Sequence, residues 1–192
     1  MTDLVALPQE TRLAARQNLL KGAGWDQARA EPLAGDASLR SYQRLHRDSE
    51  TAVLMDAPPP QEDVRPFVAM ANWLKVKGLS APELYAVNAD AGYILLEDLG
   101  DGLYSSEMAS GADEARLYDA AVDVLAAWQQ HAPPEEFPPY DDDFLLLEVS
   151  YFFDWYLKQH LGLSVTDDQR SDFLGLWQTL LADIKPGPRV LV

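Results

Sequence analysis

The sequence contains no cysteine and is poor in basic residues. The absence of cysteine excludes disulfide bonds, zinc ribbons, iron–sulfur clusters and cysteine nucleophiles. Fifteen lysine and arginine residues stand against 31 aspartate and glutamate residues, for a formal net charge of −16. Because nucleic acids and anionic membranes are bound through lysine and arginine, this charge argues against both classes of partner.

Long hydrophobic runs are also missing. No stretch of about 18 uncharged apolar residues occurs, so the sequence predicts no membrane-spanning helix. The N-terminus, Met-Thr-Asp-Leu-Val, has no basic segment before an apolar run, which disfavours a secretory signal. We therefore expect a cytoplasmic protein. The 192 residues, of which 47% are hydrophobic and 24% charged, suffice for one domain or two lobes that share a core.

The first half of the chain has the pattern of a β-rich unit. A helix is predicted over residues 8–20, because Pro8 suits the first helical position and Gly22 suits the position after the helix. A second helix over residues 63–77 carries apolar side chains at helical spacing. Short β-compatible runs predict strands at residues 28–33, 42–45, 51–55, 84–87 and 93–96.

The second half has the pattern of a helical unit. Apolar spacing and a capping box predict helices at residues 113–131, 144–161 and 166–184. Residues 189–192 have the composition of the start of a strand. The pattern changes from strands to helices near Gly100 and Gly102. This change predicts an N-terminal lobe over residues 1–98 and a helical lobe over residues 99–192.

Two short motifs have ordinary structural explanations. His46-Arg47-Asp48 matches the first residues of a kinase catalytic loop, but the asparagine required five residues later is Val53 here. A polar hairpin turn is the better interpretation. The run Asp141-Asp142-Asp143 could bind a cation, although such a run more often caps a helix and favours its positive N-terminal end.

Two other segments suggest nucleotide chemistry. Residues 35–44 hold a glycine, small side chains and two arginines between two predicted strands, so main-chain N–H groups could approach a phosphate. Residues 95–101 join the predicted lobes, and a strand leaving a lobe exposes main-chain groups that can pair with an adenine edge. A plain hairpin and an acidic linker are the respective alternatives.

Four segments together resemble the aminoglycoside phosphotransferase and kinase-like superfamily, and most closely its anomeric N-acetylmuramate/N-acetylglucosamine kinase branch of bacterial cell-wall recycling. The segments are Gly35-Asp36-Ala37-Ser38, Val-Leu-Met-Asp-Ala-Pro-Pro at 53–59, Leu-Leu-Glu-Asp-Leu-Gly-Asp at 95–101, and Pro139-Tyr140-Asp141 ahead of Glu148 and Trp155. The similarity runs from about residue 5 to the end. It implies an α+β, protein-kinase-like fold of two lobes, with an antiparallel sheet and one packed helix followed by a helical lobe.

The resemblance also implies an ATP site between the lobes. Gly35, Asp36, Ala37 and Ser38 would cover the phosphates. The Glu97 C=O and the Leu99 N–H would contact adenine, with Leu33 and Leu96 near the ring. The lysine that pairs with the phosphates in the wider superfamily is replaced by Met55. We expect Arg44, or failing that Arg40, to take its place, because either guanidinium can reach phosphate from the neighbouring strand.

The catalytic loop of the family would follow the strand predicted at residues 189–192. No catalytic aspartate and no metal ligand can therefore be assigned in these 192 residues, although ATP and Mg²⁺ are the implied cofactors. The helical lobe would also lack part of its core. We expect a longer native chain on both grounds.

The acceptor sugar is expected beside the helix predicted at residues 144–161. Glu148 and Trp155 are seven residues apart, two α-helical turns, so they would share one face. A carboxylate beside an aromatic ring suits a pyranose, since hydroxyls pair with the carboxylate and C–H groups pack on the ring. Tyr140 and Asp141 could close the same pocket. The alternative is that Trp155 is buried and Glu148 is paired with a cation or exposed.

These expectations combine into one function with two rivals. The expected reaction transfers the ATP γ-phosphoryl group to the anomeric hydroxyl of an N-acetyl amino sugar. An aminoglycoside phosphotransferase is the first rival. A non-catalytic nucleotide-binding pseudokinase is the second, favoured only if Val192 is the true C-terminus. The sequence leaves the oligomeric state open.

Overall fold

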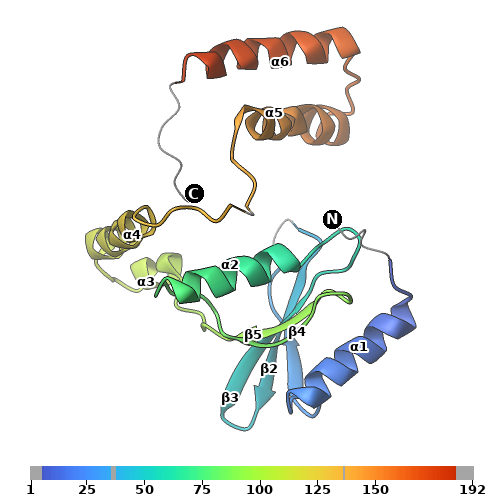
Figure 1. Ribbon diagram of the computed structural model, residues 1–192, viewed down its shortest axis with the longest axis vertical. Coiled ribbons are helices and arrows are strands. Elements are labelled where there is room, and N and C mark those ends of the chain that lie inside the picture. Colours follow the sequence, from blue (N-terminus) through green and yellow to red (C-terminus); the bar gives the residue numbers. More distant parts are fainter. Residues whose placement is uncertain (1–5, 36–37, 136, 185–192) are drawn as a thin grey trace. The chain divides into compact units, whose positions relative to one another are not determined.

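Five antiparallel strands form the sheet of the first of two units, which divide between Ala120 and Ala121 (Figure 1). The computed structural model describes residues 6–35, 38–135 and 137–184. The strands are β1 (Arg29–Pro32), β2 (Ser41–Arg47), β3 (Glu50–Asp56), β4 (Leu84–Asn88) and β5 (Tyr93–Glu97), in the order β1-β2-β3-β5-β4. All five predicted strands are confirmed, and so is the α+β class.

Strands β3 and β5 lie inside the sheet and are buried on both faces. Leu54 and Leu95 contribute to one core cluster, whereas Met55 and Ile94 contribute to the other. All four side chains are at most 1% exposed. This alternation follows from strand geometry, because successive side chains point to opposite faces of a sheet.

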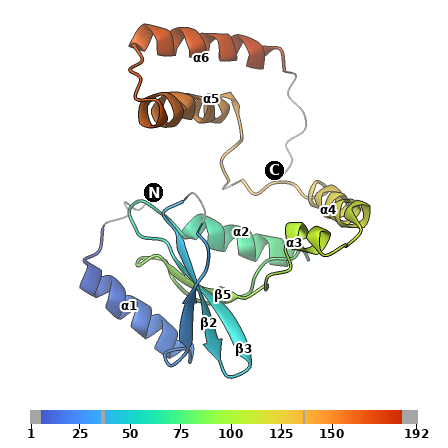
Figure 2. The same cartoon turned by 180° about the vertical axis from the view of Figure 1, so that it is seen from behind.

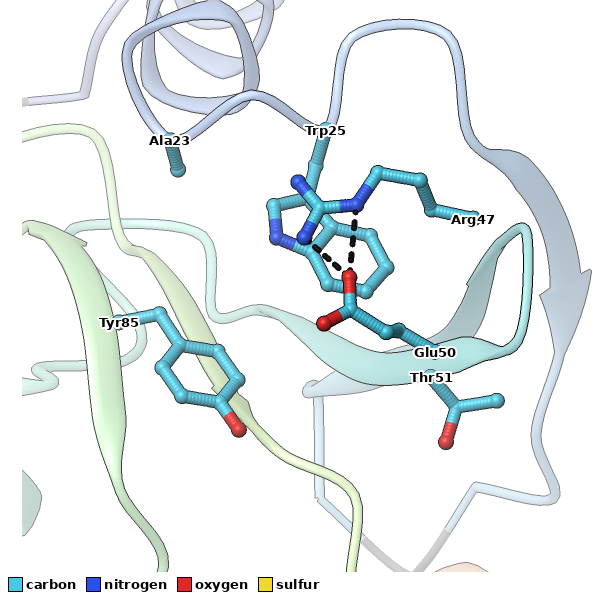
Figure 3. A pocket seen from close by; sticks show the side chains of 6 residues that line it. All are labelled: Ala23, Trp25, Arg47, Glu50, Thr51 and Tyr85. Atoms are coloured by element: carbon cyan, nitrogen blue, oxygen red, sulfur yellow. Dashed lines mark hydrogen bonds and ion pairs between the residues drawn. The ribbon is translucent and has the colours of Figure 1, made fainter.

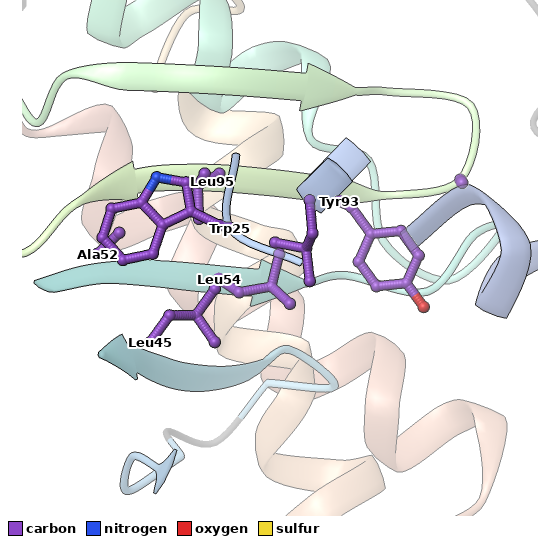
Figure 4. Packing of buried hydrophobic residues seen from close by; sticks show 8 residues of the cluster. Trp25, Leu45, Ala52, Leu54, Tyr93 and Leu95 are labelled. Atoms are coloured by element: carbon purple, nitrogen blue, oxygen red, sulfur yellow. The ribbon is translucent and has the colours of Figure 1, made fainter. Parts of the chain in front are cut away.

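Helix α1 (Gln9–Gly22) covers one face of the sheet and α2 (Arg65–Val76) covers the other (Figures 1 and 2). Leu20 belongs to the α1-side cluster, in which Figure 4 shows Trp25, Leu54 and Leu95, and Phe67 packs on the α2 side. The expectation of one packed helix was therefore incomplete. The helix predicted over residues 8–20 is α1, but its packing on the sheet was not expected, because it has a weak apolar stripe and polar contacts help to hold it.

Arg12 makes the main polar contact between α1 and the sheet. Its guanidinium pairs with Asp56 at the end of β3 and donates to the Ala91 carbonyl at 3.1 Å. The same group lies 4.8 Å from the centroid of the Tyr93 ring. Burial, followed by the charge of Asp56, raises the pKa of Tyr93. One cation thus ties α1 to the end of β3, the β4–β5 turn and the start of β5.

The second unit is helical. The helices after β5 are α3 (Tyr104–Ala109), α4 (Glu114–Trp128), α5 (Asp142–Tyr151), the π-helix η1 (Phe152–His160) and α6 (Asp167–Ala182). Of these, α3 lies in the first unit and α4 spans the division. No helix in the described ranges is long and apolar enough to cross a membrane. The strand predicted at residues 189–192 lies outside the described residues.

Inside the second unit, aromatic rings hold the π-helix against α6. Phe153 is 4% exposed, and its ring meets that of Phe173 edge to face at 4.9 Å. The Arg170 guanidinium lies over the Phe153 ring at 4.6 Å and pairs with Asp154 at 2.7 Å. The capping box predicted at Thr166 is confirmed. The change from α5 to a π-helix was not predicted, because the residues from 144 to 161 keep an α-helical apolar spacing.

Gly92 is the tightest backbone contact of the sheet. Its φ is +73°, and an added Cβ would lie 1.8 Å from the Ala57 carbonyl oxygen. The Ala57 N–H donates to the Gly92 carbonyl at 2.8 Å, so the two segments cannot separate without losing a hydrogen bond. Only glycine fits here, because it lacks the Cβ and tolerates positive φ.

Gly92→Ala should therefore destabilise the protein by at least about 3 kcal/mol, the sum of left-handed strain and a backbone clash. The matched control is Gly78→Ala, where φ is +74° but nothing lies within 4 Å of the added Cβ. That control should cost only about 1–2 kcal/mol. Urea unfolding followed by circular dichroism measures both, and equal losses would contradict the proposed clash.

Candidate functional site

The segment after β5 is the one predicted to contact adenine. Leu96 is 6% exposed and faces the α2 side of the sheet, whereas Leu99 is 69% exposed. The Glu97 carboxylate accepts the Glu83 N–H at 3.0 Å, so its side chain is used within the protein. No described residue accepts a hydrogen bond from the Leu99 N–H. A ligand at this segment would therefore meet main-chain groups.

Arg44 connects β2 to this hinge. Its Nε and Nη2 donate to the two carboxylate oxygens of Asp98 at 2.7 and 3.1 Å. Its Nη1 and Nη2 donate to the two oxygens of Asp101, both at 2.9 Å. The Asp98 oxygen Oδ1 also accepts the Gly100 N–H at 3.0 Å. The expected role of Arg44 toward phosphate stays a prediction, and its partners in the structure are two carboxylates.

The charges of this network shift one another. The hydrogen bond to Asp101 is the largest cause of a raised pKa for Arg44, and the hydrogen bond to Asp98 is the second. Hydrogen bonds from Arg44 lower the pKa of Asp101. Burial is the largest influence on Asp98 and raises its pKa, but hydrogen bonds from Arg44, Gly100 and Thr51 together lower it below its ordinary value. All three groups are charged at neutral pH.

Arg40, the other phosphate candidate, lies one residue before the start of β2. Its Nε donates to Glu62 at 2.9 Å, and this hydrogen bond is the main cause of a raised pKa for Arg40. Glu62 also accepts the Leu39 N–H at 3.3 Å. Leu33 donates its N–H to the Tyr42 carbonyl at 2.9 Å and is half-buried.

The predicted phosphate loop is only partly described. Gly35 and Ser38 are exposed, whereas Asp36 and Ala37 lie outside the described residues. The lysine position of the wider superfamily, Met55, is 1% exposed and packs in the α2-side cluster.

Two of the predicted sugar residues meet in the second unit. The Tyr140 hydroxyl donates to the Glu148 carboxylate, and this hydrogen bond raises the pKa of Tyr140. Asp141 is the N-cap of α5, and its carboxylate accepts the Phe144 N–H at 3.1 Å. The capping interpretation of the acidic run is thus confirmed for Asp141. In the described ranges no group of three acidic or histidine side chains could hold a metal ion.

Trp155 and Glu148 lie in helices of different type. Helix α5 ends at Tyr151, and Trp155 belongs to the π-helix, whose wider turns contain more residues. The α-helical spacing on which the shared face was predicted therefore does not hold across this junction, and the shared pocket stays a prediction. The alternative that buried Trp155 is wrong, since the side chain is 68% exposed.

The motif His46-Arg47-Asp48 ends in a hairpin turn, as expected. Asp48 has φ +52°, a conformation that aspartate adopts in tight turns. The Arg47 guanidinium pairs with Glu50 and lies 4.2 Å from the centroid of the Trp25 ring. Trp25, Arg47 and Glu50 line a pocket of about 500 Å³ (Figure 3). Its other lining residues are Ala23, Thr51 and Tyr85, so it is not the predicted ATP site.

Sequence reasoning missed the partners of the two arginines, namely Asp98, Asp101 and Glu62. For Asp98 a signal was available, because aspartate two residues before glycine commonly accepts the glycine N–H in a turn. The pairing of Arg44 with Asp98 depends on strand order, since β3 separates the two residues in the sheet. No local pattern contains that information.

Comparison with known proteins decides the family. Residues 29–192 match the model of the phosphotransferase enzyme family, APH. The chain belongs to this family. The resemblance predicted from the four segments is thereby confirmed.

Curated relatives narrow the comparison. The chain is 36% identical over 178 residues to a Pseudomonas aeruginosa protein named N-acetylmuramate/N-acetylglucosamine kinase, covering 91% of this chain and 52% of the relative. A protein of the same name from Caulobacter vibrioides is 41% identical over 150 residues, covering 64% of this chain and 41% of the relative. The chain spans about half the length of the curated relatives it matches.

The Arg44 network predicts a specific pH dependence. A carboxyl group with a lowered folded pKa stabilises the protein above its unfolded pKa of about 3.9, and the effect is lost as pH falls through the folded value. Asp98→Asn should therefore reduce the free energy of unfolding equally at about pH 7 and pH 5, and much less at about pH 2.

Urea unfolding of both proteins at the three pH values measures this difference. Asp90→Asn is the control, because Asp90 also pairs with an arginine but is 88% exposed. It should change stability little at any pH. If the difference in free energy of unfolding between the wild type and Asp98→Asn disappears as the pH falls from about 7 to about 5, the pKa of Asp98 is raised instead.

Proposed function

We propose that the protein is an ATP-dependent sugar kinase that phosphorylates the anomeric hydroxyl of an N-acetyl amino sugar in bacterial cell-wall recycling. Membership of the phosphotransferase family and the names of the relatives support the class of reaction. The observation that carries the proposal for this chain is the hinge, where Leu99 leaves a main-chain donor for a base. The reaction takes place in the cytoplasm.

Residues 1–98 form the nucleotide-binding lobe, and residues 99–192 begin the helical lobe. At the hinge, the Glu97 carbonyl accepts the adenine amino group and the Leu99 N–H donates to a ring nitrogen. Leu33 and Leu96 contact the ring. The absence of charge on these two side chains fits an apolar, planar base, and half-buried Leu33 keeps exposed surface for it.

The phosphates lie at the start of β2. Main-chain N–H groups of residues 35–38 bind the phosphate oxygens, which needs no lysine. Arg40 is the nearest cation that follows this loop, and its partner Glu62 holds it there. Mg²⁺, when bound, neutralises charge on the phosphates. The described residues contain no group of three acidic or histidine side chains for it, so none of its ligands is assigned in this chain.

In the reaction, the anomeric oxygen attacks the γ-phosphorus of ATP. The bond between that phosphorus and the β,γ-bridging oxygen breaks, ADP leaves, and the hydroxyl proton passes to a base. None of residues 1–192 is assigned as that base. Residues of this chain position the two substrates, and positioning supplies a large part of the barrier reduction in phosphoryl transfer.

The sugar contacts come from the second unit. Glu148 accepts a sugar hydroxyl, and the Tyr140 hydroxyl bonded to it fixes the carboxylate in place. Exposed Trp155 offers a ring face for the C–H side of a pyranose. Asp141 acts by capping α5 and so holds the segment between Tyr140 and Glu148.

The proposal is tested with the complete gene product and ATP labelled in the γ-phosphate. Transfer to N-acetylmuramate or N-acetylglucosamine, giving a product that is no longer a reducing sugar, is the expected result. Transfer only to kanamycin-type acceptors would make the protein an aminoglycoside phosphotransferase. ATP binding without transfer to any acceptor would make it a pseudokinase.

Leu99→Pro removes the N–H proposed to bind adenine. It should weaken ATP binding about tenfold or more, the cost of leaving a buried polar group unpaired. Leu99→Ala, which keeps the N–H, and Glu97→Gln, whose amide oxygen can still accept the Glu83 N–H, should bind ATP like the wild type. Isothermal titration calorimetry measures all four proteins. Equal losses in the proline and glutamine variants would instead assign adenine recognition to the Glu97 side chain.

Glu148→Gln should raise the KM for the sugar about tenfold and leave the KM for ATP unchanged, since it removes a charged hydrogen-bond acceptor. Tyr140→Phe should raise the sugar KM less, because it loosens the carboxylate without removing it. Steady-state kinetics of the complete gene product measure both constants. An unchanged sugar KM with a lower melting temperature would assign Glu148 a structural role only.

A further inference from the structure

We propose that Arg44 is a positioning residue that fixes the hinge for adenine, and that it does not bind phosphate. The inference rests on the proposed nucleotide site and assigns Arg44 a role other than the one expected from sequence. Its basis is the pairing of one guanidinium with two carboxylates, Asp98 and Asp101.

The hydrogen-bonding capacity of Arg44 is nearly exhausted by these pairs. A guanidinium has five N–H groups, and four of them donate to Asp98 and Asp101 at 2.7–3.1 Å. Bidentate pairs of this kind combine strength with a fixed geometry. A bidentate contact to phosphate would therefore require displacing one of these carboxylates.

The local charge also disfavours phosphate. Arg44 contributes one positive charge, and the two carboxylates with lowered pKa values contribute two negative charges. The Arg44 side chain is 15% exposed and that of Asp98 is 6% exposed, so water screens these two charges incompletely, whereas Asp101 is 79% exposed and its charge is well screened. The cluster has a net charge of −1, which repels the phosphates of ATP and leaves an uncharged base unaffected.

The sheet register explains how the side chain reaches the hinge. Arg44 pairs with Val53 on β3, and Val53 pairs with Leu96 on β5. The three residues therefore form a row across the sheet, on one face. The guanidinium extends across β3 and meets Asp98, two residues beyond Leu96. It links β2, the second strand of the sheet, to the point where the chain leaves the sheet after β5.

Asp98 passes this constraint to the proposed adenine donor. Its Oδ1 holds the Gly100 N–H at 3.0 Å, and Gly100 has φ +77°. Leu99 lies between these two fixed residues, so the direction of its N–H depends on the turn they form. Asp101 secures the other side of the turn, where its carbonyl accepts the Leu103 N–H at 2.8 Å. Loss of Arg44 would free both ends, and adenine would have to order the hinge as it binds.

The test compares adenosine, which carries no phosphate, with ATP by isothermal titration calorimetry. Arg44→Ala and Asp98→Asn should each weaken the binding of adenosine and of ATP by the same factor, about three- to tenfold. This factor corresponds to the cost of ordering one or two side chains on binding. Arg44→Lys should rescue only in part, because an ammonium cannot form two bidentate pairs.

Arg65→Ala is the matched control. Arg65 also pairs with two carboxylates, Asp63 and Asp90, but these lie away from the hinge. It should leave both affinities unchanged. If Arg44→Ala weakens ATP and not adenosine, while Asp98→Asn leaves ATP unchanged or strengthens it, Arg44 is a phosphate ligand and the inference is overturned.

Hydrogen exchange separates failure of the inference from failure of the proposed function. Without any ligand, Arg44→Ala and Asp98→Asn should speed the exchange of the amides of residues 98–103 and spare those of α1. Unchanged exchange would overturn the inference even if ATP binds. If the wild type binds neither adenosine nor ATP, the proposed nucleotide site is refuted, and the positioning role with it. Faster exchange in the variants would then show only that the Arg44 ion pairs stabilise this segment.

Discussion

Strands β3 and β5 are covered on both faces, by α1 on one and α2 on the other, and most other features of the first unit follow from this burial. Leu54 and Leu95 face α1, whereas Met55 and Leu96 face the α2 side. A lysine in place of Met55 would need a buried partner, because a charge without one is costly inside a protein. The polar chemistry therefore lies at strand ends, where the chain leaves the sheet.

Ion pairing has a related consequence for phosphate binding. Most cations in the described part of the first unit already have carboxylate partners. The pairs are Arg12–Asp56, Arg29–Glu31, Arg40–Glu62, Arg44–Asp98, Arg47–Glu50, Arg65–Asp63 and Lys75–Glu83. In a chain with a net charge of −16, attraction for ATP must come from local groups rather than from an overall field. In the proposed function, main-chain N–H groups of the glycine-containing loop would supply this attraction, since their donors need no side-chain cation.

Local patterns predicted the elements well, since strands and helices depend on spacing along the chain. The five strands, α2, the capping box at Thr166 and the N-cap at Asp141 followed from such patterns. Helix α3, Tyr104–Ala109, was missed because six residues are too few to show a period. The π-helix was missed because its sequence has no distinctive composition, so the spacing of Glu148 and Trp155 was treated as α-helical throughout.

The candidate site was less predictable because it depends on contacts between distant residues. The hinge could be proposed from Leu96, Glu97 and Leu99, which are consecutive or nearly so. The Arg44–Asp98 pair joins residues 54 positions apart across an intervening strand. The missing lysine at Met55 identified Arg44 as the residue to explain, and only the strand order identified its partner.

The most direct test of the account is an amide NMR titration of the protein with adenosine. The account predicts the largest chemical-shift changes at the Leu99 N–H and its neighbours in the hinge, with no change at the Trp25 side chain or the Tyr85 amide of the 500 Å³ pocket. Shifts that gather around Trp25 and Tyr85, with an unmoved Leu99 resonance, would contradict it.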